Sequence, residues 1–560
     1  MGFLKPTVTL CCVLLSVIVT EKTDKQPLVT TKYGKLLGRK VKVLETDRPV
    51  DTFMGIPFAK PPVGELRFAN PQPPEPWNSI RDATKDPPMC LQNQKLMEEV
   101  KKHFKIETPS PPFSEDCLYI NIFTPGDREK NSKLPVMMFI HGGGLQVGGA
   151  IFFDGAALSA YENVVTVSIQ YRLAILGFTS TGDKRLSGNY GFMDQVAALQ
   201  WIQENIKDFG GDPESVTVFG ESAGGLSTSA LVLSPLAKGL FHRAIAESGT
   251  AIVRTLMITD PKEMISRINY VANKSGCDPD KLADCVKKKT EKEILLISDS
   301  MGLLDVPGCV DGVFLPKPPE EIMANKQSNN VPFIIGINNQ EFGWLLFQVM
   351  NVDGFQDGMD KQTVQSLLKI VDFLHLTEKS IPLVMEEYFG DTSDPFEIRD
   401  RFLDLCGDII FVIPALKTAK YHRDSGFPVY FYEFQHPLAV AKNTRPDYVK
   451  SDHGDEIYYV MGAPFLHADA SSKDGRTEKE RHFSKTMMKY WANFARNGDP
   501  NGPGLVKWPR YQENEAYMQL DLEQKPSEKY KADKFVFWTK TLPEAIQKMS
   551  EEHREDHREL

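Results

Sequence analysis

A serine flanked by glycines offers the clearest chemistry in this chain of 560 residues. The segment GESAG at 220–224 fits the pattern G-x-S-x-G, in which a serine hydroxyl on a tight strand-to-helix turn attacks a carbonyl carbon. The bare pattern should match by chance about 0.2 times in such a chain, so the flanking sequence must show whether the match is functional. The β-branched run SVTVF precedes it, and the small-residue helix pattern AGGLSTSALVL follows it. We therefore interpret Ser222 as a candidate nucleophile at a helix N-terminus, where developing negative charge is favoured.

A glycine run upstream could stabilise that negative charge. The segment HGGG at 141–144 follows the apolar run LPVMMFI. Successive glycines let backbone N–H groups turn toward a substrate oxygen, which is the task of an oxyanion hole. The N–H of Ala223, directly after the candidate serine, would complete it. Together with the serine motif, this run indicates acyl-transfer chemistry rather than a flexible loop.

A serine hydroxyl needs a base that takes its proton, and the base needs a carboxylate that orients it. Behind a motif of this type the chain order is serine, then acid, then histidine. His453 lies in SDHGDE at 451–456, a polar turn beyond the apolar run PVYFYEF. Loops at the carboxyl ends of parallel strands carry the sites of such architectures. His453 is therefore the favoured base, and His436 is the second candidate.

The acid should occupy a similar loop between the serine and the histidine. Glu341 follows the apolar run VPFIIGI through the polar residues at 338–340, and this run is long enough for a buried strand. Asp305 lies in a run that is too short and is broken by a proline, and Asp311 precedes a glycine, which suits a turn. We favour Glu341, with Asp305 and Asp311 as alternatives.

Short apolar runs in alternation with helical patterns must position these residues. We expect buried strands at 136–140, 164–169, 215–219, 331–336 and 429–432. Helices are expected at 192–206 and over an apolar pattern that ends at Gly498. This alternation predicts an α/β fold with a large, mostly parallel central sheet covered by helices on both faces. The segments 57–76 and 361–402 are expected to be surface excursions of a single domain over 27–556.

The composition is that of an ordinary globular protein. The chain has a mass of 63.0 kDa, with 41% hydrophobic and 25% charged residues. A chain of this length can bury a large core, which excludes disorder as its main state. Its net charge is -10 at pH 7, and its pI is near 5.7. An acidic chain without a basic stretch disfavours nucleic acid as a partner.

The two ends of the chain carry targeting patterns. An apolar run over 7–20 is too short to span a bilayer and suits the core of a signal peptide, which we place at 1–26 with cleavage within 20–26. The last four residues, HREL at 557–560, resemble the retrieval signals of the endoplasmic reticulum. Together they predict residence in the reticulum lumen, with a retrieval receptor as partner and secretion as the alternative. No other segment is apolar enough for a transmembrane helix.

An oxidising lumen would let cysteines pair. Removal of the signal peptide would leave six of the eight cysteines, and six allow many connectivities. Two local pairings are plausible, Cys90–Cys117 and Cys277–Cys285. Cys309 and Cys406 are then expected to stay free. In the same compartment, the sequon at Asn273 could carry a glycan.

Several longer stretches show what the chain resembles. It is similar to the type-B carboxylesterases of the α/β-hydrolase fold over essentially its whole mature length. The matching stretches are SEDCLYIN at 114–121, HGGG at 141–144, FGESAGG at 219–225, GINNQEFGW at 336–344 and DHGDE at 452–456. Within the family it most resembles the vertebrate type 2 carboxylesterases and the avian medium-chain fatty acyl-CoA hydrolases. The stretches STGDK at 180–184, VDGVFLP at 310–316 and YWANFARNG at 490–498 carry that likeness.

The resemblance implies a role for each matching position. Ser222 would be the nucleophile, Glu341 the acid and His453 the base. Gly142, Gly143 and Ala223 would donate to the oxyanion, and the two local cysteine pairs would be the family's two disulfides. No metal and no organic cofactor is implied.

The resemblance also implies a substrate class. The chain is expected to hydrolyse carboxylic esters, with medium-chain acyl-CoA and other thioesters as a further class. Cholinesterases carry a tryptophan in the loop of the first disulfide that binds a quaternary ammonium. Residues 91–116 contain no tryptophan, which disfavours a choline ester. A lipase-like acylglycerol hydrolase is the alternative, and a non-catalytic adhesion or scaffold relative is a remote one, because such relatives lack the serine and carry a transmembrane helix.

Overall fold

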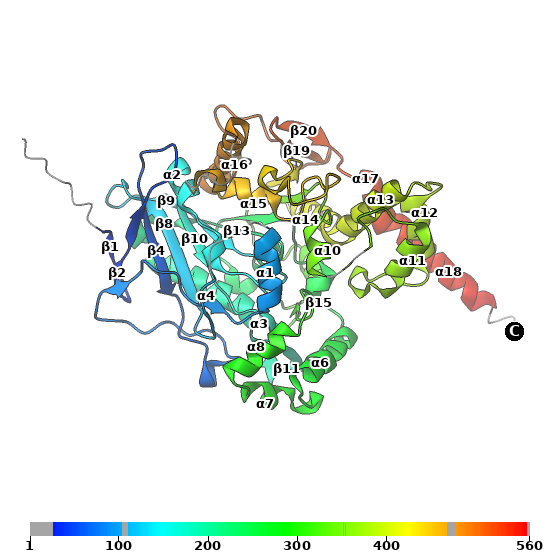
Figure 1. Ribbon diagram of the computed structural model, residues 1–560, viewed down its shortest axis with the longest axis horizontal. Helices are drawn as coiled ribbons and strands as arrows, with labels where there is room; N and C mark the ends of the chain where they lie inside the picture. The colour runs from blue at the N-terminus through cyan, green and yellow to red at the C-terminus, as the bar shows by residue number, and fades with distance from the viewer. Residues whose placement is uncertain (1–25, 104–109, 351, 353, 467–476, 557–560) are drawn as a thin grey trace, which may run out of the picture.

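One large sheet with helices on both of its faces organises the protein (Figure 1). The structure, a computed structural model, describes residues 26–103, 110–350, 352, 354–466 and 477–556. The expected signal peptide, apart from its last residue, and the expected HREL tetrapeptide lie outside these ranges. Among the described residues, no helix is long and apolar enough to cross a membrane.

The sheet has eleven strands, and its central part is parallel. In order across the sheet the strands are β20 (Lys525–Glu528), β19 (Ala516–Leu520), β18 (Val429–Phe434), β17 (Phe333–Asn338), β14 (Arg243–Glu247), β13 (Gly211–Glu221), β9 (Leu134–Ile140), β10 (Val165–Ile169), β8 (Tyr119–Pro125), β4 (Val50–Pro57) and β3 (Arg39–Val41). The strands from β19 to β10 pair in parallel, whereas β20, β8, β4 and β3 pair antiparallel at the two edges. The carboxyl ends of the parallel strands therefore all lie on the same side of the sheet, which is where such folds place their active sites.

The central strands are apolar along their whole length because both faces of the sheet are covered. In β9, Val136, Met138 and Ile140 belong to one buried cluster, whereas Met137 and Phe139 belong to the other. Helices α4 (Tyr190–Asn205) and α5 (Ala223–Leu233) pack into the first cluster. Helices α2 (Ala156–Glu162) and α16 (Glu478–Asn497) pack into the second. The core thus consists of two layers separated by the sheet.

The other helices and short strands surround this core. The helices are α1 (Gln94–His103), α3 (Ala174–Phe178), α6 (Pro261–Ser275), α7 (Leu282–Lys287), α8 (Glu291–Asp299), α9 (Pro319–Ala324), α10 (Leu345–Val349), α11 (Lys361–Ile370), α12 (Ser380–Phe389), α13 (Pro395–Gly407), α14 (Ile413–Asp424), α15 (Asp455–Val460), α17 (Ala532–Val536) and α18 (Leu542–Asp556). The short strands are β1 (Leu28–Thr31), β2 (Gly34–Leu37), β5 (Arg81–Asp82), β6 (Met89–Cys90), β7 (Phe113–Ser114), β11 (Ser180–Asp183), β12 (Leu186–Ser187), β15 (Met257–Ile258) and β16 (Gly308–Cys309). These short strands pair with one another in small sheets apart from the main sheet.

The predicted α/β fold is confirmed, and the five expected strands correspond to β9, β10, β13, β17 and β18. The helix expected at 192–206 is α4, and the helix expected to end at Gly498 is α16, which Gly498 terminates with φ 71°. The segment 361–402, which was expected to be a surface excursion and whose structure the sequence left open, forms α11, α12 and most of α13. Asp360 and Asp394 cap two of these helices through their side chains. With α18 they lie at one end of the molecule, on the right of Figure 1.

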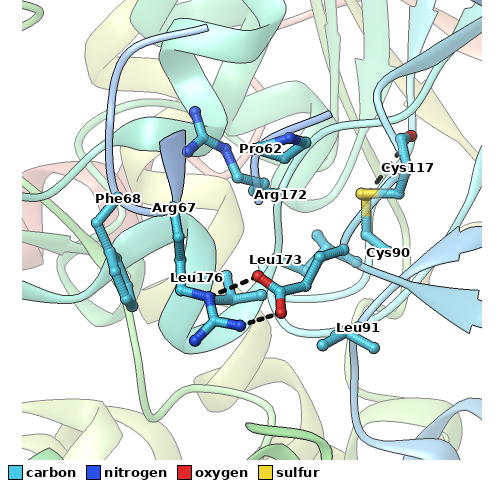
Figure 2. Close-up of a pocket in the computed structure, with 10 residues that line it drawn as sticks. Pro62, Arg67, Phe68, Cys90, Leu91, Cys117, Arg172, Leu173 and Leu176 are labelled. Carbon is cyan, nitrogen blue, oxygen red and sulfur yellow. Dashed lines mark hydrogen bonds and ion pairs between the residues drawn. A yellow bond between two sulfur atoms is a disulfide. The ribbon is translucent and has the colours of Figure 1, made fainter. Parts of the chain in front are cut away.

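Both expected disulfides, Cys90–Cys117 and Cys277–Cys285, are present, and Cys309 and Cys406 are free and buried. Arg67, Cys90 and Cys117 line one small pocket, as Figure 2 shows. Arg67 forms an ion pair there with Glu115, whose Oε2 accepts from Nε of Arg67 at 2.6 Å. The Cys90–Cys117 disulfide closes the loop that contains α1. The small pocket beside this disulfide is lined mainly by the disulfide, the ion pair and apolar side chains, and none of the candidate catalytic residues lines it.

Candidate active site

Ser222 lies on a strained turn between β13 and α5. It has φ 59° and ψ -121°, a sparsely populated region for a residue with a side chain. Such a conformation costs about 1–3 kcal/mol and persists only where its surroundings impose it. Here the N–H of Ser222 donates to the carbonyl of Glu247 at 2.8 Å. A Cβ at Gly224 would lie 2.0 Å from the carbonyl oxygen of Ile140, so only glycine permits this close approach of β9 and α5.

The glycine run at 141–144 lies directly beside this serine. A Cβ added at Gly142 would lie 3.0 Å from the Cβ of Ser222. The carbonyl of Gly143 accepts two N–H groups of the turn that follows, at 2.9 and 3.0 Å, which fixes the loop. Within the described ranges, the N–H groups of Gly142, Gly143 and Ala223 donate to no other residue. Three backbone donors next to a serine hydroxyl suit the binding of an oxyanion.

Glu341 and His453 form a direct hydrogen bond. Nδ1 of His453 lies 2.6 Å from Oε2 of Glu341. Because a carboxylate only accepts, Nδ1 carries the proton and donates it. The other oxygen of Glu341 accepts from Oγ of Ser248 and from the N–H of Asn338, both at 2.7 Å. Glu341 is only 2% exposed, so its orientation is fixed by these contacts.

The second ring nitrogen of His453 faces the serine turn. Nε2 lies 3.2 Å from Oε1 of Glu221, the residue that precedes Ser222. The ring of Phe411 packs on the imidazole with 4.7 Å between centroids, and Phe411 and Ser222 line one cavity. Nε2 makes no hydrogen bond in the described part of the chain, so no serine-to-imidazole bond is formed. Such bonds commonly tighten only when a substrate is bound.

Carboxylates surround the imidazole and set its charge. Burial by itself would lower the pKa of His453, but Glu221, Glu341 and Asp452 raise it above its ordinary value. Burial raises the pKa of Glu221, and Glu341 raises it further, whereas His453 lowers it. The positive charge that His453 acquires when it takes a proton is therefore stabilised.

Two further buried acids belong to this region, and the sequence analysis missed both. Oε1 of Glu247 accepts from the indole of Trp491 at 3.1 Å, and Oε2 of Glu456 accepts from the amide of Asn338 at 2.6 Å. Burial raises the pKa of both acids well above the ordinary value. Glu456 was recognisable as the last residue of DHGDE. Glu247 gave no signal, because its place depends on β14 lying beside β13.

The alternative candidates lie in other contacts. Nδ1 of His436 lies 2.9 Å from Asp521, and Nε2 lies 2.8 Å from Glu480, so both ring nitrogens are engaged. Asp305 accepts from a tyrosine hydroxyl and from a backbone N–H of its own turn. Asp311 accepts from two N–H groups of its turn. The structure thus brings Glu341, and neither aspartate, to His453.

A small, mostly apolar cavity borders the serine. Ser222, Gly144 and Gly249 form its polar end, and leucine, phenylalanine, valine, isoleucine and methionine side chains form most of the rest. None of the lining side chains is charged. The cavity therefore suits an uncharged, apolar group of a substrate.

The expected glycosylation site lies away from the serine. Asn273 is exposed on α6. Among the residues that the structure describes, no group of three or more His, Cys, Asp or Glu side chains could hold a metal ion.

Comparison with known proteins decides the family. The model of the carboxylesterase family matches residues 25–538. The chain belongs to the carboxylesterase family. This carboxylesterase is 48% identical to the duck (Anas platyrhynchos) protein named fatty acyl-CoA hydrolase precursor, medium chain, over 96% of this chain and 97% of that protein. It is 49% identical to carboxylesterase 1D of the rat (Rattus norvegicus), over 92% and 93%. It is 47% identical to the human (Homo sapiens) cocaine esterase, over 98% of each.

The family confirms the predicted reaction class. The chain is an enzyme, a carboxylic ester hydrolase with a small-molecule ester as substrate. The resemblance to carboxylesterases and to the avian acyl-CoA hydrolase is confirmed with it.

Proposed function

We propose that this carboxylesterase works through an acyl-enzyme on Ser222, with His453 as the base and Glu341 as the acid that orients it. The observation that carries the proposal is the 2.6 Å hydrogen bond between Nδ1 of His453 and Glu341, next to the strained turn at Ser222. Because Glu341 occupies Nδ1, the proton acceptor of the imidazole is Nε2, the nitrogen that faces the serine turn.

In the first half of the reaction, Oγ of Ser222 attacks the acyl carbon while Nε2 of His453 takes its proton. The carbonyl oxygen becomes an oxyanion that accepts from the N–H groups of Gly142, Gly143 and Ala223. One such donor contributes about 10²–10³-fold to turnover. The imidazolium of His453 then gives its proton to the leaving alcohol, and the acyl group stays on the serine.

In the second half, a water molecule replaces the alcohol. His453 takes a proton from the water, whose oxygen attacks the acyl carbon and passes through a second oxyanion. Collapse of this oxyanion breaks the bond to Oγ, the imidazolium returns a proton to Ser222, and the carboxylic acid leaves. Glu341 keeps its hydrogen bond to Nδ1 throughout and stabilises the imidazolium.

Acyl thioesters of medium chain length are the further substrate class that we infer. The duck relative is named for this substrate class, and the side chains that line the cavity beside Ser222 are mostly apolar, as an alkyl chain requires. Because no charged side chain lines the cavity, the charged coenzyme A group would remain outside it. A lipase-like activity on acylglycerols is the alternative. A non-catalytic adhesion or scaffold role is opposed by the presence of Ser222 and by the family of the chain.

We also propose that the enzyme resides in the lumen of the endoplasmic reticulum, through a signal peptide at 1–26 and retrieval of HREL by its receptor. Two disulfides fit an oxidising compartment. The exposed sequon at Asn273 fits the same compartment.

A substrate panel tests the proposed reaction. Purified wild-type enzyme and Ser222→Ala are compared on short esters, medium-chain acyl-CoA and emulsified long-chain triacylglycerol. We expect hydrolysis of esters and acyl-CoA by the wild type, none by Ser222→Ala, and little turnover of the emulsion. Ester turnover that survives Ser222→Ala would contradict the proposal.

A further inference from the structure

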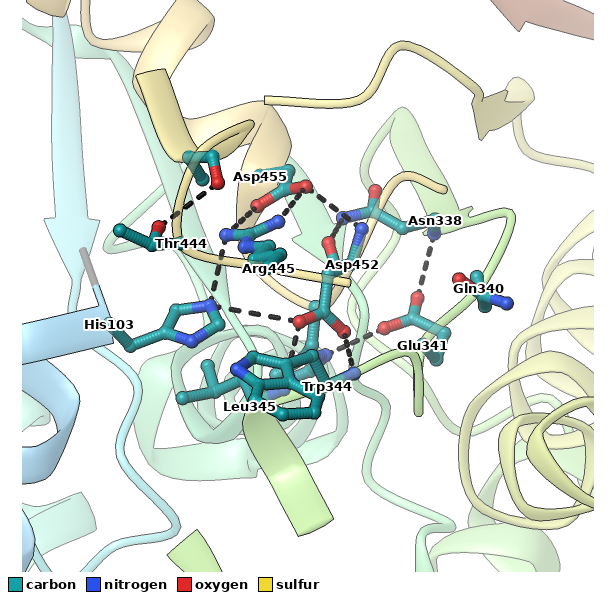
Figure 3. A network of polar contacts seen from close by, with 12 residues as sticks. His103, Asn338, Gln340, Glu341, Trp344, Leu345, Thr444, Arg445, Asp452 and Asp455 are labelled. Atoms are coloured by element: carbon teal, nitrogen blue, oxygen red, sulfur yellow. Dashed lines mark hydrogen bonds and ion pairs between the residues drawn. The ribbon is translucent and has the colours of Figure 1, made fainter. Parts of the chain in front are cut away.

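A buried carboxylate joins the loop of Glu341 to the loop of His453. Asp452 directly precedes His453 and has no exposed surface. Its Oδ1 accepts from the N–H of Trp344 at 3.1 Å, and its Oδ2 accepts from the N–H of Leu345 at 2.8 Å. These two residues lie three and four positions after Glu341, at the start of α10. Figure 3 shows both beside Asp452. One side chain therefore connects two segments that are more than a hundred residues apart in sequence.

The polar run at 338–340 supports the same junction. The amide of Asn338 donates to the carbonyl of Asp452 at 2.7 Å. The N–H of Gln340 donates to the carbonyl of Ser451 at 3.1 Å, and its side-chain oxygen accepts from the N–H of Lys450 at 2.6 Å. These contacts hold the two loops in register, and they explain why three amides in a row precede Glu341.

A buried cation balances the charge of the junction. Arg445 donates to both oxygens of Asp455, at 2.7 and 2.8 Å, and to Nε2 of His103 at 2.9 Å. Asp455 accepts in turn from the N–H of Asp452 at 2.9 Å. His103, the last residue of α1, lies 3.7 Å from Oδ2 of Asp452. Burial and the charges of Arg445 and His453 lower the pKa of His103 to about 3, so it is neutral.

We propose that Asp452 is a positioning residue of the triad, which holds the Glu341 loop against the His453 loop and whose negative charge favours the protonated imidazole. This inference rests on the proposed function. The inference goes beyond that function because it gives a fourth residue a part in positioning His453 and in setting its charge. Asp452 itself does not touch the substrate.

Replacement by asparagine would break this junction in a defined way. Asparagine has nearly the size of aspartate, but one of its two oxygens becomes an NH₂ group. If its oxygen still accepts from Trp344, its NH₂ faces the N–H of Leu345, and two donors oppose each other. The N–H of Leu345 then loses its partner in a buried place, which moves α10 and the nearby Glu341. A displacement of about 1 Å at a reacting group costs about 10²-fold.

The negative charge of Asp452 also affects the pKa of His453. The titratable groups that face its imidazole are Glu341 after β17, Glu221 at the end of β13, Asp452 on its own loop and His103 on α1. Since His103 is neutral, removal of the Asp452 charge leaves two carboxylates in place of three. The pKa of His453 should fall, and the acid limb of kcat/KM should move to lower pH.

Kinetics of Asp452→Asn on a short ester, across a range of pH, test this proposal. We expect kcat to fall about 10–100-fold and KM to stay within about twofold of the wild type. The midpoint of the acid limb of kcat/KM should move to lower pH. Asp447→Asn removes the same charge from an exposed position of the same loop and should change none of these values. Gly343→Ala places a Cβ 2.9 Å from the side chain of Gln340 and 3.1 Å from that of Asp452, and it keeps the charge. It should lower kcat without moving the midpoint, and it serves as the second variant if Asp452→Asn does not fold.

Two results would overturn the proposal. One is wild-type kcat and midpoint in Asp452→Asn, and the other is full kcat in Gly343→Ala when Asp452→Asn fails to fold. A loss that appears in KM alone also counts against a role in positioning the triad. The variant Ser222→Ala distinguishes a failure of the proposed function from a failure of the proposal about Asp452. If Ser222→Ala stays active, the proposed function itself fails, whereas an inactive Ser222→Ala beside a normal Asp452→Asn contradicts only the present proposal.

Discussion

Nε2 of His453 lies 3.2 Å from Oε1 of Glu221, the residue that directly precedes Ser222. The same imidazole donates through Nδ1 to Glu341, so it stands between two carboxylates. Oε1 of Glu221 has no hydrogen-bond partner among the described residues. A carboxylate at this distance from His453 stabilises the imidazolium, and it connects the proposed pH dependence of the enzyme to a residue outside the triad.

The acid limb of the pH profile should therefore reflect these carboxylates. His453 must be neutral to take a proton, and its pKa is raised. We expect kcat/KM to increase with pH through a midpoint above the ordinary histidine value of about 6.5. Glu221→Gln removes one of the charges that raise this pKa, so its midpoint should lie lower than that of the wild type. Ester hydrolysis in a pH-stat measures both midpoints.

Glu214→Gln provides the control for this comparison, because Glu214 is an exposed carboxylate on β13. Its midpoint should equal that of the wild type. An unchanged midpoint in Glu221→Gln would show that the contact with Nε2 does not govern the charge of the base.

Replacement of Glu341 by glutamine should abolish most of the turnover. The substitution keeps the shape but removes the charge that stabilises the imidazolium and that fixes the proton on Nδ1. For a comparable triad carboxylate, the amide lowers turnover by about 10⁴-fold, or about 5.5 kcal/mol of barrier. Steady-state kinetics and circular dichroism together separate this loss from a loss of folded protein.

Asp305→Asn and Asp311→Asn are the matched controls for Glu341→Gln. Both aspartates accept from their own turns and do not contact His453, so each variant should lose less than about tenfold. If one of them lost about 10⁴-fold while Glu341→Gln stayed near normal, the acid would be misplaced.

A methyl group at Gly142 should damage the oxyanion site. The Cβ of Gly142→Ala would lie 2.7 Å from the carbonyl oxygen of Glu221 and 3.0 Å from the Cβ of Ser222, so the loop must move. Displacement of one oxyanion donor costs about 10²–10³-fold in kcat. Gly302→Ala meets only ordinary contacts, at 3.5 Å or more, and should keep wild-type kcat. Equal activity of the two variants would argue against an oxyanion role for this loop.

Removal of HREL should release the enzyme from the cell. The tetrapeptide at 557–560 resembles a retrieval signal, so its deletion should move most of the enzyme into the medium. Immunoblots of cells and medium measure the distribution, and exchange of HREL for four alanines controls for chain length. Equal retention of all three forms would contradict the proposed residence.

Local patterns predicted the serine, the acid and the favoured histidine because each follows an apolar run that had to be a buried strand. The same logic favoured His453 but left His436 as the second candidate, since both follow β18. Glu480 on α16 and Asp521 after β19 decide the matter, because they occupy both nitrogens of His436. Neither contact is visible before the chain is folded.

The buried acids show the same limit. Glu247 ends a strand, β14, whose sequence RAIAE is too short and too polar to be recognised alone. The role of Asp452 depends on contacts with Trp344 and Leu345, which are 108 and 107 residues away. The structure of 361–402 was left open by the sequence, and there α12 packs against both α11 and α13.

Covalent labelling of the serine tests the central claim most directly. Wild-type enzyme is treated with a fluorophosphonate, its mass is measured intact, and its peptides are mapped. We expect one label per chain, on the peptide that contains Ser222, complete loss of ester hydrolysis, and no label on Ser222→Ala. Labelling of Ser222→Ala at the wild-type rate, or a label on another residue that accounts for the inhibition, would contradict the account.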